Sequence, residues 1–232
     1  MRRRSPHFAI ARNAVETHQD GVHIHVLPAG PIQTNAYLLT APELREAVLI
    51  DAPAGIWMEI EPLLAGAGCT LGELWLTHGH WDHTQGGAEV VRSTWAKVRA
   101  HRADRELIEN PGAMEEFVIP GTRLGPIKVD HFVAQGQRWK ALGEAVEVRH
   151  VPGHCPGNVL FHFPQTSAAF VGDAIFNSGI GRTDLPGGSF EELERSIRGQ
   201  IYTLPDETVL YPGHGPETTV GAEKETNPYV TA

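Results

Sequence analysis

The stretch Leu74-Trp75-Leu76-Thr77-His78-Gly79-His80-Trp81-Asp82-His83 joins an apolar run to three histidines and an aspartate that fall within six residues. A protein core disfavours four titratable groups together, because buried charges and unpaired imidazoles are costly to desolvate. Imidazole nitrogen and carboxylate oxygen are, however, the ligands that borderline divalent cations such as zinc, iron and manganese prefer. The stretch therefore predicts a metal site at the carboxyl end of a strand over residues 73–77.

The spacing of the four side chains adds a geometric expectation. Side chains two apart in an extended segment point the same way, so His78 and His80 can reach one ion together. Asp82 and His83 are neighbours, and they converge only through a turn or a helix start, which directs them to a second point. One short loop thus offers two ligand pairs, which raises the possibility of two adjacent metal ions.

Three further segments place one candidate ligand each after an apolar strand. His154 lies in Pro152-Gly153-His154-Cys155-Pro156-Gly157, Asp173 ends the run Phe170-Val171-Gly172, and His214 lies in Pro212-Gly213-His214-Gly215-Pro216. Glycine and proline give these turns a defined shape, and ligands of α/β sheets usually bind at the carboxyl ends of strands. The candidate ligand set is therefore His78, His80, Asp82, His83, His154, Asp173 and His214.

Two residues near this set have competing interpretations. Asp51 ends the apolar run of residues 47–50. It is either an ordinary cap or a second-layer acceptor for the outer nitrogen of a ligand histidine. Cys155 is adjacent to His154, and we interpret it as a small packing residue because a bound metal already supplies the nucleophile.

The composition excludes several classes of protein. The chain has 232 residues with 41% hydrophobic content, which is enough for a large core. A net charge of −9 argues against a nucleic-acid partner, since such proteins usually carry a basic face. Two cysteines form no disulfide framework, and no apolar run reaches the roughly 18 residues of a membrane span. We expect a cytoplasmic protein with a small-molecule substrate and no membrane partner; the oligomeric state is left open.

Hydrophobic periodicity predicts a layered α/β protein with mixed sheets. The expected strands cover residues 22–28, 33–40, 47–50, 73–77, 96–100, 127–133 and 145–151, and the expected helices cover 55–65, 86–92 and 102–109. Residues 1–20 are polar and unpatterned, and we expect an N-terminal arm there. No linker divides the remainder, so residues 21–232 are expected to form a single domain.

The pattern His78-x-His80-x-Asp82-His83, followed by His154, Asp173 and His214, resembles the metallo-β-lactamase superfamily. The resemblance implies a four-layer αβ/βα sandwich of two mixed β-sheets with outer helices. It also implies two divalent metal ions (Zn, Fe or Mn) per chain. By this resemblance one ion is held by His78, His80 and His154, the other by Asp82, His83 and His214, and Asp173 bridges the two.

Three segments resemble the glyoxalase II-like group in particular, namely residues 172–176, Gly181-Arg182-Thr183-Asp184, and residues 213–219. Full-length glyoxalase II has a C-terminal helical domain that helps to bind glutathione. The 18 residues after His214 are too few for one, so the chain resembles the short, single-domain members. Asp173 stands where the best-known zinc β-lactamases have cysteine, which disfavours that activity.

The resemblance implies a dinuclear hydrolase in which a metal-bridging hydroxide attacks a hydroxyacyl thioester or related ester. Asp82 and Asp173 are the expected catalytic carboxylates, with Asp82 orienting the hydroxide. Arg182 either binds a substrate carboxylate through its forked donors or pairs with Asp184.

Three alternatives have the same motif. One is a persulfide dioxygenase with a single iron at the positions of His78, His154 and Asp173. The others are a lactonase and a metal-binding module without turnover.

Overall fold

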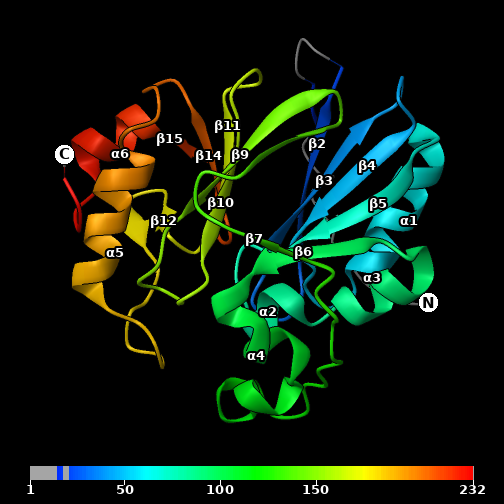
Figure 1. Ribbon diagram of the computed structural model, residues 1–232, viewed down its shortest axis with the longest axis horizontal. Helices are drawn as coiled ribbons and strands as arrows, with labels where there is room; N and C mark the ends of the chain where they lie inside the picture. The colour runs from blue at the N-terminus through cyan, green and yellow to red at the C-terminus, as the bar shows by residue number, and fades with distance from the viewer. Residues whose placement is uncertain (1–14, 18–20, 232) are drawn as a thin grey trace, which may run out of the picture.

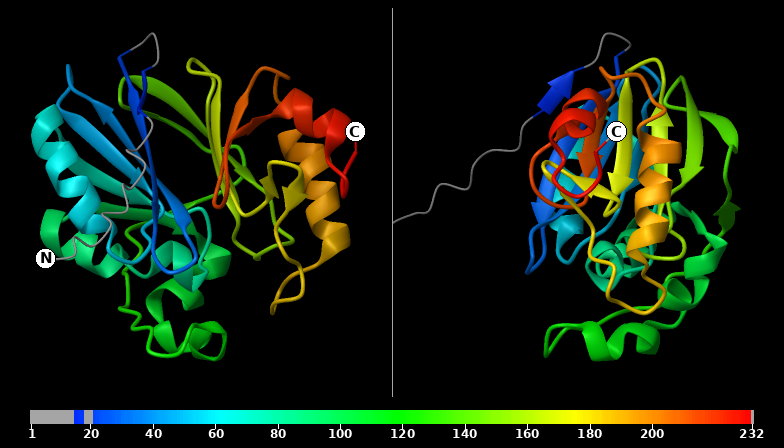
Figure 2. Two further views of the ribbon diagram at one scale, coloured as in Figure 1. Left: turned by 180° about the vertical axis from the view of Figure 1, so that it is seen from behind. Right: turned by 90° about the vertical axis from the view of Figure 1, so that its left-hand side faces the viewer.

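The computed structural model describes residues 15–17 and 21–231, in which two β-sheets face each other and helices cover their outer sides (Figure 1). The first sheet has seven strands and the second has six, and a separate pair, β12 (Ile175–Phe176) and β13 (Gly179–Ile180), forms a small hairpin. Figure 2 shows the same arrangement from behind and from one end.

The first sheet runs in chain order. Its strands are β1 (Val15–Thr17), β2 (His23–Ala29), β3 (Thr34–Ala41), β4 (Glu46–Ile50), β5 (Thr70–Trp75), β6 (Lys97–His101) and β7 (His131–Val133). Strands β1 to β4 pair antiparallel, and β4 to β7 pair parallel. Parallel neighbours need crossover connections, and here these include α1 (Ile56–Ala67) and α3 (Gly87–Thr94).

The second sheet has the order β15-β14-β11-β10-β9-β8. Its strands are β8 (Arg138–Ala141), β9 (Glu144–His150), β10 (Val159–Phe163), β11 (Ala168–Gly172), β14 (Val209–Pro212) and β15 (Thr218–Thr219). Its one parallel pair, β11 with β14, is connected through α5 (Phe190–Ser196) and the π-helical turn η3 (Ile197–Ile201). Helix α6 (Val220–Thr226) follows β15.

Three buried apolar clusters define the four layers. Between the sheets lie large aromatic side chains, among them Trp75 and Phe161. Between the first sheet and its helices lie aliphatic side chains such as Leu74 and Ile60. A third cluster, with Leu160 and Leu193, joins the second sheet to its helices. Strands buried on both faces read as continuous apolar runs, and the αβ/βα sandwich expected from the sequence is confirmed.

Two expectations differ from the structure. Of the strand expected over residues 127–133, only His131–Val133 pairs with a neighbour. Ile127 and Val129 are buried in the cluster outside the first sheet instead, so their alternation reflects packing without a ladder. Within the expected arm, Val15–Thr17 pairs with β2 as strand β1, and the other residues of 1–20 lie outside the described part of the chain.

The helix expected over residues 102–109 begins with a 3-10 turn, η1 (Arg102–Asp104), and continues as α4 (Arg105–Glu109). A further 3-10 segment, η2 (Pro111–Phe117), follows. Among the described residues, none of the helices has the length and apolar character needed to span a membrane.

Candidate metal centre

The strand ends that carry the candidate ligands meet at one edge of the sandwich. Backbone hydrogen bonds join the two sheets there: Val159 N donates to Thr77 O at 2.8 Å, and Asn35 N donates to Gly213 O at 2.8 Å. The short helix α2 (Trp81–Thr84) begins directly after His80. This helix start brings the neighbours Asp82 and His83 to one point, as the sequence requires for them to converge.

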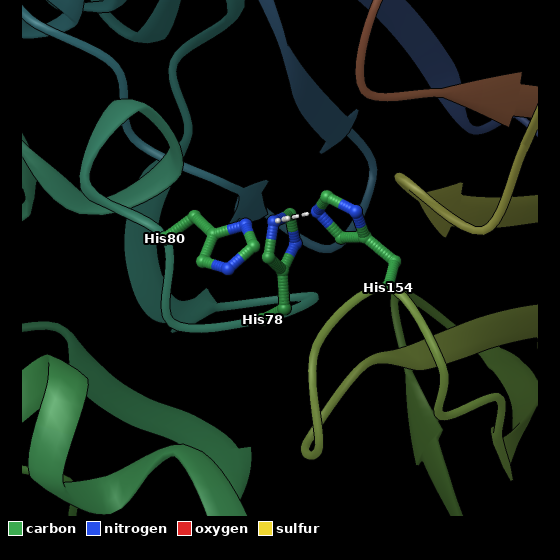
Figure 3. A group of neighbouring side chains, drawn as sticks. All are labelled: His78, His80 and His154. Carbon is green, nitrogen blue, oxygen red and sulfur yellow. Dashed lines mark hydrogen bonds between the residues drawn. The ribbon is translucent and has the colours of Figure 1, made fainter. Parts of the chain in front are cut away.

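All seven candidate side chains come together in three overlapping groups. The groups are His78, His80 and His154; His78, His83 and Asp173; and Asp82, His83 and His214. Within each group the possible ligand atoms lie within 4.8 Å of one another. Figure 3 shows the first group, in which His154 approaches His78 and His80 from the opposite side; the Nε2 atoms of His154 and His78 are 3.3 Å apart.

The outward nitrogens of three of these histidines have hydrogen-bond partners. His78 Nδ1 lies 3.1 Å from Thr77 Oγ1, His83 Nδ1 lies 2.7 Å from Asp51 Oδ2, and His154 Nδ1 lies 2.7 Å from the carbonyl oxygen of Arg182. Such contacts suit an Nδ1–H donor and direct Nε2 toward a metal. The three imidazoles are therefore oriented as a metal site requires.

Two buried polar atoms in the centre of the cluster lack a hydrogen-bond partner among the described residues. These are His83 Nε2 and Asp173 Oδ1, which lie 3.2 Å apart. A buried polar group without a partner costs free energy, and a cation bound by both atoms removes that cost. The donor set, imidazole nitrogens and carboxylate oxygens, thus fits divalent metal ions.

Burial and charge divide the imidazoles into two kinds. Burial lowers the pKa of His78 well below its usual value and that of His80 to about 3, so both are neutral. Burial also acts to lower the pKa of His83 and of His214, but nearby carboxylates outweigh it. The pKa of His83 is raised well above its usual value and that of His214 to about 9. The part of the centre around Asp173 therefore favours positive charge.

Asp51 contacts both the motif loop and a candidate ligand. Its carboxylate accepts hydrogen bonds from Thr77 N at 2.8 Å and Thr77 Oγ1 at 2.7 Å, besides the contact with His83. Its backbone has a φ of 58°, which is uncommon for a residue other than glycine. The Asp51 carboxylate thus lies within hydrogen-bond distance of His83 Nδ1, and its role as a second-layer acceptor in metal binding stays a prediction.

Two residues that the sequence did not single out contact the ligand loops. Thr34 Oγ1 donates to Asp82 Oδ2 at 2.7 Å. Asp104, fully buried at the end of η1, accepts hydrogen bonds from Gly79 N at 2.8 Å and Gly157 N at 2.6 Å. It therefore ties the loop of His78 and His80 to the loop of His154. Nothing in the local pattern Arg102-Ala103-Asp104-Arg105 could have revealed this, since both partners are distant in sequence.

Cys155 is buried against the same carboxylate. Its Sγ donates to Asp104 Oδ2 at 3.1 Å, and burial together with the Asp104 charge raises the pKa of the thiol. A buried thiol whose pKa is raised is a poor nucleophile, which agrees with its interpretation as a packing residue.

A cavity of about 680 Å³ opens over the centre, with His80, Asp82, His154, Asp173 and His214 among its lining residues. Its walls are mostly apolar. The segments up to the end of η2 contribute Ile32, Trp81, Met114 and Phe117, and the segments from β12 onward contribute Phe176, Ile180 and Leu185.

Arg182 and Asp184 complete the lining of this cavity, and both are exposed. They form a two-bond ion pair, with Nε to Oδ1 at 2.7 Å and Nη2 to Oδ2 at 2.8 Å. Of the two alternatives for Arg182, the structure therefore contains the ion pair with Asp184. A role for Arg182 in binding substrate stays a prediction.

Comparisons with known proteins agree with this geometry. The profile of the Metallo-beta-lactamase superfamily matches residues 29–214. Hydroxyacylglutathione hydrolase GloC of Haemophilus influenzae is 32% identical over 91% of this chain and 99% of its own length.

Two solved structures are similar throughout. The BLEG-1 B3 metallo-beta-lactamase has a TM-score of 0.83 at 34% identity, covering 90% of this chain and all of the other. TTHA1623, solved in a di-iron-bound form, has a TM-score of 0.75 at 34% identity, covering 88% of this chain and 99% of the other. With the profile spanning most of its length and its His/Asp clusters at the strand ends, the chain belongs to the metallo-β-lactamase superfamily.

Proposed function

We propose that the chain is a dinuclear metal-dependent hydrolase that cleaves a thioester or a related ester. Membership of the superfamily supports a metal-dependent hydrolase. The observation that carries the dinuclear form is the overlap of the three side-chain groups around the unpartnered atoms His83 Nε2 and Asp173 Oδ1. In this proposal His78, His80 and His154 would hold one ion, Asp82, His83 and His214 would hold the other, and Asp173 would contribute its carboxylate to the centre.

A pair of divalent ions bound there supplies an acidified water as nucleophile and polarises the carbonyl oxygen of the substrate. Asp82 orients that water as a hydrogen-bond acceptor. The Thr34 hydroxyl holds one of its oxygens, and His214 Nε2 lies 3.3 Å from the same oxygen. Asp173 balances charge in the centre. Cys155, the thiol nearest to the ligands in sequence, is buried and supplies no nucleophile.

Three observations support the choice of substrate and the domain organisation. A cavity of about 680 Å³ above the centre suits a small molecule. The similarity to GloC favours a thioester, and a thiolate is a good leaving group that needs little acid catalysis.

The two sheets share one buried cluster and exchange backbone hydrogen bonds, which supports a single domain over residues 21–232.

The first test is metal content together with turnover. Protein purified without chelator, and samples loaded with zinc, iron or manganese, are analysed for metal and assayed with a panel of thioesters, esters, lactones and a β-lactam. We expect two equivalents per chain and hydrolysis of thioesters. One equivalent of iron with oxygen uptake on a persulfide would replace the hydrolase with a dioxygenase.

A matched pair of variants links the metal to the proposed ligands. His214→Asn removes a proposed ligand, and we expect it to lose about one metal equivalent and most turnover. His162→Asn is the control, because His162 is a buried imidazole on β10 outside the three groups. Retention of both equivalents and of activity by His214→Asn would contradict the assignment.

A further inference from the structure

The mouth of the metal cavity combines a polar floor with apolar walls. Ile32, in the turn between β2 and β3, is 43% exposed, and Phe117, at the end of η2, is 38% exposed. Both line the cavity, together with the buried side chain of Met114. Exposed apolar side chains gathered around a concave site mark a surface that binds apolar groups.

Outside the metal centre, the described side chains around this mouth provide no unpaired cation for an anionic group. Among the described lining residues, Arg182 and Asp184 are the charged side chains outside the metal centre, and they neutralise each other. A substrate carboxylate that displaced Asp184 from Arg182 would leave the Asp184 charge close beside it. The chain as a whole carries a net charge of −9, which repels anions at longer range.

We propose that this mouth binds an uncharged hydrocarbon acyl chain, and that the substrates are medium-chain acyl thioesters or esters with a small, uncharged leaving group. This inference rests on the proposed hydrolase function and specifies its substrate. In the reaction, the oxygen of water forms the new bond to the acyl carbon and the carbon–sulfur bond breaks. The sulfur leaves with the bonding electrons and takes up a proton, which gives a carboxylic acid and a thiol.

Glutathione conjugates are disfavoured by the same features. Glutathione carries two carboxylates, and away from the metal centre each would lose hydration without gaining an unpaired cation among the described lining side chains. An acyl chain, by contrast, gains from every methylene that it buries against Ile32, Met114 and Phe117. Full burial of one methylene corresponds to roughly fourfold in kcat/KM, and half burial to about twofold.

The first arm of the test compares substrates on the metal-loaded enzyme. Acetyl, butyryl and hexanoyl thioesters of N-acetylcysteamine are compared with the same thioesters of glutathione. We expect kcat/KM to rise at least roughly 15-fold from acetyl to hexanoyl, which is about twofold for each of four methylenes. We also expect the N-acetylcysteamine esters to be at least as good as the glutathione esters.

The second arm measures binding without turnover. S-hexyl-N-acetylcysteamine and S-hexylglutathione are thioethers that cannot be hydrolysed, and their affinities are measured by calorimetry. We expect the uncharged thioether to bind at least as tightly. Phe117→Ala should reduce the hexanoyl-to-acetyl ratio of kcat/KM about three- to tenfold. Leu44→Ala is the control, because Leu44 is 50% exposed and does not line this cavity.

The outcomes separate the inference from the function on which it rests. Turnover with no dependence on chain length, or with glutathione thioesters preferred tenfold, overturns the acyl-chain inference and leaves the hydrolase intact. Binding of the uncharged thioether by a metal-loaded enzyme that hydrolyses neither thioesters nor esters overturns the hydrolase and retains the apolar site. Failure of both thioethers to bind overturns the inference as well.

Discussion

Asp104 provides the sharpest test of how the two halves of the sandwich hold the metal centre. Its carboxylate accepts three hydrogen bonds, from Gly79 N, Gly157 N and Cys155 Sγ. All three partners are donors, so the carboxylate acts only as an acceptor. Both glycines lie so close to it that an added Cβ would collide with Asp104 or its surroundings. The substitution Asp104→Asn replaces one accepting oxygen with an amide that donates.

The expected loss of stability follows from these contacts. Whichever way the amide turns, its nitrogen meets a donor, and at least one backbone N–H is left buried without a partner. An unsatisfied buried group costs about 1–3 kcal/mol, and the lost charge-assisted bond adds to this. We expect the free energy of unfolding to fall by about 3 kcal/mol in total, which lowers the Tm of a chain of this size by about 6–12 °C.

The assay combines thermal unfolding in the presence of chelator with metal titration. Because Asp104 positions the loops of His80 and His154, we expect Asp104→Asn to lower the affinity for one of the two metal ions about 10- to 100-fold. Asp130→Asn is the matched control: Asp130 Oδ2 accepts from Val98 N at 3.1 Å, away from the ligand loops. The free energy of unfolding of Asp130→Asn should stay within about 1 kcal/mol of the unsubstituted protein, and both metal affinities should be retained.

The two variants separate a structural role from a positioning role. If Asp104→Asn lost stability but kept both metal affinities, Asp104 would be a structural residue only. If its stability and its affinities both matched the control, the carboxylate would not join the loops at all.

Three further predictions concern the centre itself. Gly213→Ala should abolish binding of at least one metal ion, because the added Cβ collides with the Asp173 carboxylate; two retained equivalents in elemental analysis would contradict this packing. Metal affinity should rise with pH up to about 9, because His83 and His214 hold protons below their raised pKa values and a metal binds only the neutral imidazoles. Calorimetry in buffers of different ionisation enthalpy should therefore detect proton release at pH 7, and zero release would refute the assignment. Removing metal with a chelator should lower the Tm, because ions that bind only the folded chain stabilise it. Relative to protein at free metal 100-fold above the dissociation constant, the loss is about 2.7 kcal/mol, or about 5–10 °C, for each bound ion. An unchanged Tm in scanning calorimetry would indicate that no ion is bound.

Much of the centre could be predicted because its determinants are local. The two-residue spacing of His78 and His80 and the apolar runs before Asp173 and His214 are visible in short windows of sequence. Alternation and strand length are properties of a few adjacent residues. Three helices, over residues 55–65, 86–92 and 102–109, were predicted for the same reason, whereas α5 and α6 were not. In α1, apolar residues at helical spacing precede Gly68, which ends the helix in a left-handed conformation.

The periodicity of residues 127–133 shows where local patterns mislead. Alternation identifies a segment with one buried face, and it does not distinguish a strand in a sheet from a chain packed outside one. Ile127 and Val129 bury their side chains beyond the first sheet. Asp130 N donates to Val98 O on β6, and His131–Val133 then pairs with β6 as strand β7.

The sequence alone predicted a layered α/β protein with mixed sheets from its periodicity, and the candidate ligands from strand ends and side-chain chemistry. The four-layer sandwich was implied by the resemblance to the superfamily. Only the tertiary structure decided which residues support those ligands and what surrounds them. Asp104 lies 25 residues from Gly79 and 53 from Gly157, and Thr34 lies 48 from Asp82. The contact between Asp104 and Gly157 depends on how the two sheets dock against each other, and the other two depend on how distant strands of the first sheet lie side by side. No short window of sequence contains that information, because docking is a property of whole surfaces.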